Sequence, residues 1–149
     1  MNLLGQVSSK ALPNADASTG GRGASIDINA PGNVVITATP AAPLPGTISL
    51  NAETLSSWNA ESLVIGGKRV RDATGTTLVV SSSNITVNNA GHALSAPDLT
   101  LAATNGITLR PGALLDSSGT LDGRAESLRV TGNGSLIRVS QDRSAEVVR

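Results

Sequence analysis

The chain of 149 residues contains no cysteine, no phenylalanine and no tyrosine, and it has one tryptophan and one histidine. Without cysteine there is neither a disulfide nor a thiolate metal site. A metal site built on two histidines is excluded because His92 has no second histidine to join it. Aromatic side chains usually supply much of the core volume of a compact domain. A core built from Leu, Ile, Val and Ala therefore indicates a thin, regular interior.

Net charge and long apolar runs are also missing. Eleven basic residues balance eleven acidic ones, so the formal net charge is zero, and the basic face that nucleic acid binding requires is not expected. No apolar run approaches the roughly 18 residues that cross a membrane. The first ten residues, MNLLGQVSSK, lack the features of a signal peptide. We expect Met1 to be an internal residue of a larger protein or an added start.

Short apolar segments separated by turn residues fill the chain instead. Many of them alternate apolar and polar residues, as in Ile26-Asp-Ile28, Leu99-Thr-Leu101 and Ile107-Thr-Leu109. A period of two is typical of β-strands, and dipeptides such as Asn105-Gly106 and Asn133-Gly134 are typical of turns. The sequence therefore predicts an all-β protein.

The apolar residues also recur at a longer spacing. They form three series, and the spacing within each is about 22 residues, which indicates a repeat architecture. The series are Ile26, Ile48, Val70, Leu94, Leu114 and Leu136; Val34, Leu55, Leu78, Leu99 and Leu121; and Leu63, Ile85, Ile107 and Leu128. We predict a single-stranded parallel β-helix, or solenoid, with about 22 residues and three short strands in each coil.

This β-helix is expected to occupy residues 23–140 in about five coils. Residues 1–22 are interpreted as a leader or the end of a preceding coil, and residues 141–149 as a charged tail that is a cap or a truncated coil. Because short corners join successive strands of a coil, hairpins are not expected. Residues 40–46 contain three prolines and predict a stiff corner, while residues 68–75 are expected to loop out near the third coil.

Stacked coils place equivalent side chains above one another at about 4.8 Å. Ile85 is therefore expected beside Ile107, and the threonines that follow each of them side by side. Asp116 and Arg138, which lie one repeat apart, are expected to pair across coils at the surface. With both charges outside, the inward residues of these segments are Leu115, Ile137 and Val139, which leaves Leu114 and Leu136 as an exposed apolar strip.

The sequence offers few candidates for chemistry. Gly20-Gly-Arg-Gly23 lacks the Lys-Ser/Thr of a phosphate loop, which favours a flexible turn. His92 is interpreted as a corner residue. Trp58 is expected to cover a coil edge or a corner, with a sugar-stacking platform as the alternative. Lys68, Arg69 and Arg71 are interpreted as a solvated loop, with contact to an anionic glycan as the alternative.

Three aspartates bear on enzymatic activity, because β-helical enzymes that cut acidic polysaccharides need clustered carboxylates. Asp98, Asp116 and Asp122 occupy different positions in the repeat. This spacing does not bring them together on one face and favours a solvated surface. We predict no catalytic, cofactor-binding or metal-binding residue.

Three segments resemble the repeat region of filamentous-haemagglutinin-like exoproteins of Gram-negative bacteria. They are residues 23–38 (GASIDINAPGNVVITA), 55–67 (LSSWNAESLVIGG) and 94–112 (LSAPDLTLAATNGITLRPG). The resemblance implies a right-handed β-helical shaft that is exported by two-partner secretion and displayed as an adhesin or a toxin-delivery stalk. Neither the family's N-terminal secretion domain nor a toxin domain is recognisable in this sequence.

The expected function is that of a non-catalytic shaft segment of a secreted or cell-surface adhesin. The expected partners are a host or bacterial surface glycan or protein and, within a larger exoprotein, an outer-membrane transporter. One alternative is a small β-helical enzyme that acts on polysaccharides. Another is a cytoplasmic, bactofilin-like protein that polymerises into filaments by end-to-end self-association.

Overall fold

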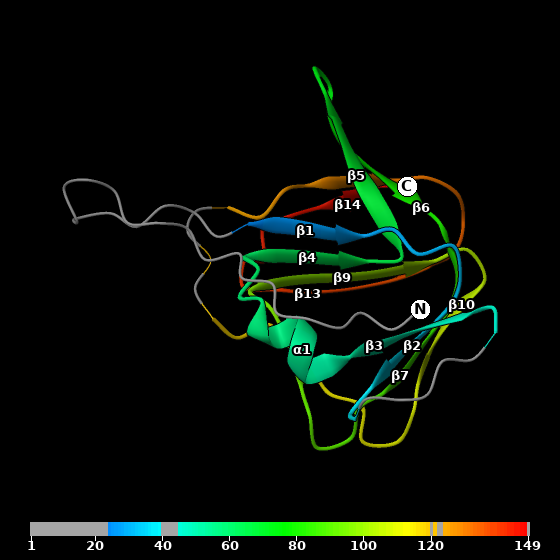
Figure 1. Ribbon diagram of the computed structural model, residues 1–149. Coiled ribbons are helices and arrows are strands. Elements are labelled where there is room, and N and C mark those ends of the chain that lie inside the picture. Colours follow the sequence, from blue (N-terminus) through cyan, green and yellow to red (C-terminus); the bar gives the residue numbers. More distant parts are fainter. Residues whose placement is uncertain (1–23, 40–44, 120, 122–123, 149) are drawn as a thin grey trace.

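The computed structural model describes residues 24–39, 45–119, 121 and 124–148 (Figure 1). The described part is mostly strand, with one short helix, α1 (Ala52–Ser57). The strands are β1 (Ser25–Ile28), β2 (Gly32–Thr37), β3 (Thr47–Asn51), β4 (Ser62–Ile65), β5 (Gly67–Asp72), β6 (Gly75–Val80), β7 (Ser82–Asn88), β8 (Leu94–Ser95), β9 (Asp98–Ala103), β10 (Gly106–Leu109), β11 (Leu115–Asp116), β12 (Leu128–Val130), β13 (Ser135–Ser140) and β14 (Val147–Val148).

These strands form four separate sheets. The central sheet has the order β1-β4-β9-β13, in which only β13 runs antiparallel to its neighbour. The parallel sheet has the order β10-β7-β2-β3, with every pair parallel. The outer sheet has the order β14-β12-β6-β5, and β8 pairs with β11 on its own. Figure 1 shows the central sheet across the molecule, with the β5–β6 hairpin projecting beyond it.

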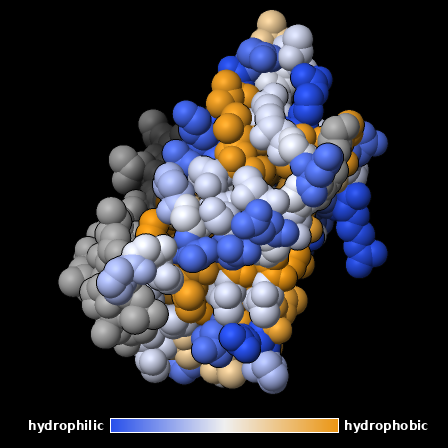
Figure 2. Space-filling model, turned by 90° about the vertical axis from the view of Figure 1, so that its right-hand side faces the viewer, coloured by the Kyte–Doolittle hydropathy of each residue, from blue (hydrophilic) through white to orange (hydrophobic). Residues whose placement is uncertain are grey.

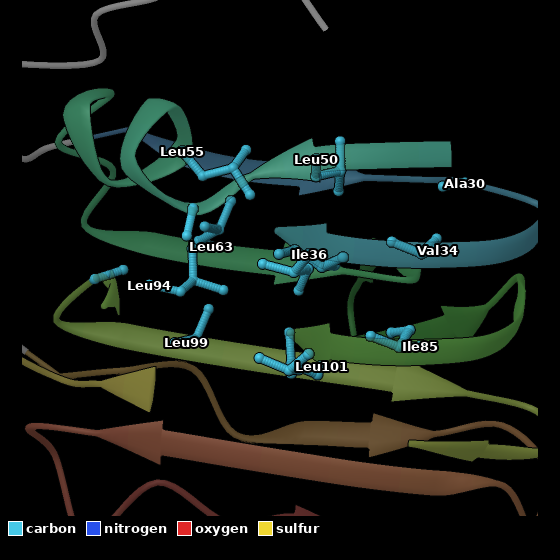
Figure 3. Packing of buried hydrophobic residues seen from close by; sticks show 14 of the residues in the cluster. Ala30, Val34, Ile36, Leu50, Leu55, Leu63, Ile85, Leu94, Leu99 and Leu101 are labelled. Atoms are coloured by element: carbon cyan, nitrogen blue, oxygen red, sulfur yellow. The ribbon is translucent and has the colours of Figure 1, made fainter. Parts of the chain in front are cut away.

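The main core lies between the central sheet, the parallel sheet, α1 and the β8–β11 pair. Leu63, Leu99 and Leu101 of the central sheet face Ile36 and Ile85 of the parallel sheet, and each is at most 1% exposed (Figure 3). The alternation seen in the sequence is responsible, because every second residue of these strands points to this side. The core is aliphatic apart from Trp58.

A second core lies on the opposite face of the central sheet, under the outer sheet. Val64 and Ala102 of the central sheet pack there against Leu78, Leu128 and Val130. The central sheet is therefore buried on both faces, and every residue of β4 and β9 is buried. Alternation alone would have placed Val64 and Ala102 in solvent.

Two glycines let the chain pass from the central sheet to the outer sheet. Gly66 has a φ of +99°, and a Cβ there would lie 1.9 Å from the carbonyl oxygen of Ala102. A Cβ on Gly67 would lie 2.6 Å from the carbonyl oxygen of Val79. Only glycine fits so close to a neighbouring backbone.

The prediction of one parallel β-helix of about five coils is wrong. The described residues form four small sheets that contain both parallel and antiparallel pairs. The repeat spacing joins Ile85 to Ile107, and Thr86 to Thr108, as expected. It also holds in the β8–β11 pair, where Leu94 lies opposite Leu115. It fails in other pairs: Ile85 also pairs with Val34, which lies more than two repeats earlier in the chain.

Two segments that leave the sheets and return account for the failure. One is the β5–β6 hairpin, an antiparallel pair from Gly67 to Val80, which separates Leu63 from its partner Leu99 by well over one repeat. The other contains β3 and α1 and lengthens the path from Ile26 to its partner Leu63 in the same way. The expected exclusion of hairpins was wrong, and residues 68–75 form most of this one.

The remaining expectations about segments have mixed outcomes. Leu115, Ile137 and Val139 pack against the main core and Leu114 is 44% exposed, as predicted, but Leu136 packs against the second core. In the tail, β14 pairs with β12. Residues 1–22 and most of the expected stiff corner at 40–46 lie outside the described residues.

Candidate functional site

A pocket of about 260 Å³ lies where the central sheet, the hairpin and residues 121–126 meet. Its lining is rich in charged and hydroxyl side chains. It consists of Ser25, Glu61, Ser62, Arg69, Leu121, Arg124, Ala125 and Glu126. The pocket is the strongest candidate site in the described part of the chain, so the charges in and around it decide what it does.

Arg69 occupies the inner wall of the pocket, and its side chain is 2% exposed. Its Nε donates to Asp27 Oδ1 at 2.6 Å, and its backbone N–H donates to Asp27 Oδ2 at 2.7 Å. Its Nη1 donates to the hydroxyl of Ser62 at 2.7 Å. The guanidinium thereby joins β5 to β1 and β4.

A second ion pair, in which both side chains are buried, lies beside the first. Arg138 donates to both carboxylate oxygens of Asp98, from Nε at 2.9 Å and from Nη2 at 3.1 Å. The two side chains are 7% and 3% exposed. The hydroxyl of Ser62 donates to Asp98 Oδ2 at 2.7 Å, so Ser62 links this pair to Arg69.

A third ion pair closes the outer side of the pocket. Arg71 of the hairpin donates to both carboxylate oxygens of Glu126, and Thr76 Oγ1 donates to Oε2 at 2.5 Å. Partial burial would raise the pKa of Glu126, but the hydrogen bonds from Arg71 and Thr76 and the charges of Arg71 and Arg69 together outweigh it. The pKa of Glu126 therefore lies below its ordinary value, and the carboxylate is charged at neutral pH.

Each of the charged side chains in and around the pocket interacts with another group of the protein. Asp27, Asp98 and Glu126 each face an arginine, and Glu61 and Arg124 on the pocket wall also interact within the molecule. General acid–base catalysis works best with a carboxyl group whose pKa lies near the operating pH, and the pKa of Glu126 is shifted in the other direction. The hydrogen bonds of the ion pairs join β5 to β1 and β9 to β13.

The predictions for the aspartates and for Arg138 are only partly correct. Asp98 is 2% exposed, so the expectation of a solvated surface is wrong there, whereas Asp116 is exposed on β11. The expected pair of Asp116 with Arg138 is also wrong, because Arg138 pairs with Asp98. Asp122 and residues 20–23 lie outside the described residues.

The basic segment 68–71 is not the solvated loop that was expected. Lys68 is exposed, but the side chain of Arg69 is buried and Arg71 is paired with Glu126. The sequence held no signal for the buried network, because the partners Asp27 and Arg69 are far apart in the chain and belong to different sheets.

His92 and Trp58, the single histidine and the single tryptophan, both have structural positions. His92 lies in a turn, as predicted, and its backbone N–H donates to the carbonyl of Asn89. Its Nδ1 lies 2.5 Å from Glu53 Oε1. Trp58 is 3% exposed and belongs to the main core, so it is not a surface platform for sugars.

The described residues contain neither a metal-binding cluster nor a membrane-spanning helix, and no similar protein was found. Within the described residues there is no group of three or more His, Cys, Asp or Glu side chains that could hold a metal ion. The helix in this part of the chain is too short and too polar to cross a membrane. Comparison with protein-family models, with curated proteins and with solved structures gave no match. The resemblance to filamentous-haemagglutinin-like repeats therefore stays a prediction.

Proposed function

We propose that this chain is a non-catalytic structural segment of a secreted or cell-surface exoprotein that acts in adhesion. The observation that supports the structural role is the charge network around the pocket. Through Asp27, Ser62, Arg69, Asp98 and Arg138 it connects β1, β4, β5, β9 and β13. Its charged groups hold strands of two sheets together.

Such a network has a physical consequence for the fold. Buried ion pairs add little net stability compared with apolar packing, but removing one partner leaves a buried charge that is costly. The pairs therefore act against alternative strand registers, in which Asp98 or Asp27 would lose its arginine. A protein that displays binding surfaces needs this fixed geometry more than it needs a reactive centre.

The location and the adhesive role depend on the resemblance of residues 23–38, 55–67 and 94–112 to exoprotein repeats. Under this proposal the partners are surface glycans or proteins of a host or a bacterium, and an outer-membrane transporter exports the larger protein. Exposed Ser, Thr and Asn side chains and the projecting hairpin supply the contact surface. Figure 2 shows hydrophilic side chains interrupted by apolar ones on the face that includes the hairpin.

Labelling of the producing cells tests the proposed location. Antibodies raised against the purified chain are applied to intact cells and to permeabilised cells. We expect labelling of intact cells, and its loss after mild treatment with protease. Labelling only after permeabilisation would contradict the proposal and would favour the alternative of a cytoplasmic filament protein.

An activity assay tests the non-catalytic part. The purified chain is incubated with pectin-like and alginate-like polysaccharides, and new chain ends are measured. We expect no release above that of buffer. Release that is lost in Glu126→Gln but kept in Asp116→Asn, an exposed carboxylate away from the pocket, would show that the pocket is an active site.

A further inference from the structure

The strand orders of the central and parallel sheets make the two ends of the molecule complementary. The chain passes from β1 to β2, from β4 through the hairpin to β7, and from β9 to β10, so these strands of the central and parallel sheets lie at matching levels. Among the described residues, β3 extends the parallel sheet one strand beyond β2 at one end, while β1 is the last strand of the central sheet. At the other end, β13 extends the central sheet beyond β9, while β10 is the last strand of the parallel sheet.

At the β10 end the interior of the molecule is open. Ile36 pairs with Val87, and Val87 pairs with Leu109, so these three side chains form one row across the parallel sheet. The first two are 0% exposed, whereas Leu109 is 51% exposed. The row of side chains is thus buried in β2 and β7 and reaches solvent in β10.

The backbone of β10 is open as well. The N–H of Arg110 donates to Val87 on the neighbouring strand. In a parallel pair alternate residues bond to opposite sides, so the N–H and C=O groups of Ile107 and Leu109 point away from β7. No described residue pairs with them. Proteins usually protect such edges with proline, lysine or a bulge, but β10 reads Gly-Ile-Thr-Leu.

The opposite end offers a matching strand. β3 is the other edge of the same parallel sheet and reads Thr-Ile-Ser-Leu-Asn, with the same alternation as β10. Leu50 of β3 pairs with Ile36 and so belongs to the row that ends at Leu109. The ends also differ in charge: an exposed Arg110 follows β10, and Glu53, with a side chain 66% exposed, lies in the first turn after β3.

We propose that the edge of β10 binds β3 of a second copy of this chain, in parallel and in register, so that the parallel sheet continues from one copy to the next. Leu50 of the second copy covers Leu109, and Glu53 of the second copy lies beside Arg110. β3 fills the space beside β13, and β13 in turn lies against β1 of the second copy. The contact joins unlike ends, so it repeats and produces open rods. It does not depend on the exoprotein assignment.

Sedimentation velocity of the purified chain over a wide concentration range tests the association. We expect the mean size to grow with concentration through a ladder of species without a fixed stoichiometry. Leu109→Lys, which places a charge on the edge, should weaken association by at least about tenfold. Val70→Lys is the matched control, because Val70 is a similarly exposed strand residue, 43%, on the hairpin. A chain that stays monomeric at all concentrations, or equal effects of the two variants, would overturn the proposal.

Cysteine cross-linking tests which strands meet. The chain has no cysteine of its own, so Thr108→Cys and Ser49→Cys introduce single thiols at positions that lie opposite each other in the proposed register. An equimolar mixture of the two variants should form the mixed disulfide on mild oxidation. Disulfides mainly between two Thr108→Cys chains would show pairing of β10 with β10 and would contradict the head-to-tail contact.

Charge reversal tests the orientation. Arg110→Glu and Glu53→Arg should each weaken association severalfold, and a chain that carries both changes should recover most of the loss. Absence of this recovery, in a chain that still associates and forms the mixed disulfide, would contradict the position of α1 of the second copy beside Arg110.

Discussion

Neutralising Asp98 should destabilise the protein far more than neutralising Glu126. Both carboxylates bond an arginine through both oxygens, but their surroundings differ. The Asp98–Arg138 side chains are 3% and 7% exposed, whereas those of Glu126 and Arg71 are 34% and 53% exposed. In Asp98→Asn the guanidinium of Arg138 stays buried without a counter-charge.

The magnitude follows from that difference. Breaking a buried ion pair by removing one partner costs about 3–5 kcal/mol, which for a chain of this size lowers the melting temperature by about 10–15 °C. Breaking an exposed pair costs about 0–1 kcal/mol, so Glu126→Gln should melt close to the wild type. Nη1 of Arg138 is buried without a hydrogen-bond partner among the described residues, which adds to the cost of keeping this charge inside.

A double variant separates the lost pair from the lost side chain. Asp98→Asn combined with Arg138→Met removes both charges, and the amide oxygen introduced by Asp98→Asn can still accept the hydrogen bond that Ser62 donates to Asp98. We expect the double variant to recover most of the stability, measured by thermal and urea unfolding. If Asp98→Asn costs no more than Glu126→Gln, the second face of the central sheet is not buried and the account of the outer sheet is wrong.

Three further predictions concern single positions. Gly66→Ala should cost at least about 3 kcal/mol in urea unfolding, because it combines strain at positive φ with a clash against the backbone of Ala102; Gly75→Ala, where a Cβ has open space, should cost about 1–2 kcal/mol, and equal costs would refute the clash. The depressed pKa of Glu126 stabilises the folded protein at a pH above the unfolded-state pKa, and this stabilisation is lost as the pH falls through the lower, folded-state pKa. The stability difference between wild type and Glu126→Gln should therefore shrink below about pH 4. A difference that does not change with pH would contradict this assignment. Ile85→Ala should cost about 2–5 kcal/mol because the side chain is 1% exposed, and a cost below about 1 kcal/mol would place it outside the core.

The sequence predicted the strands well because their cause is local. Alternation identified Ile26-Asp-Ile28, Leu99-Thr-Leu101 and Ile107-Thr-Leu109. Each segment lies in a strand, and its apolar residues face the main core, except that Leu109 reaches solvent. The stacking of Ile85 on Ile107 was predicted correctly because no insertion lies between β7 and β10 that would change the repeat spacing.

The sheet arrangement was not predicted, because it depends on contacts that alternation does not encode. The same pattern that points Leu99 into the core points Asp98 and Thr100 outward, and a single-layer wall would expose them. The outer sheet covers that side, so both are buried. A buried charge needs a partner, and the partners come from strands far away in the chain: Arg138 for Asp98, and Asp27 for Arg69. The candidate site was missed for this reason.

The chain leaves the central sheet at Gly66, forms the hairpin from Gly67 to Val80, and enters the parallel sheet at Ser82, whose N–H bonds back to the carbonyl of Gly66. The tip of the hairpin, Ala73-Thr74, is exposed and far from both cores (Figure 1). A foreign peptide grafted there would leave the central and parallel sheets unchanged, since doubling the length of a flexible loop costs only about 0.6 kcal/mol. The projecting hairpin thus makes this small protein a carrier on which an epitope can be presented.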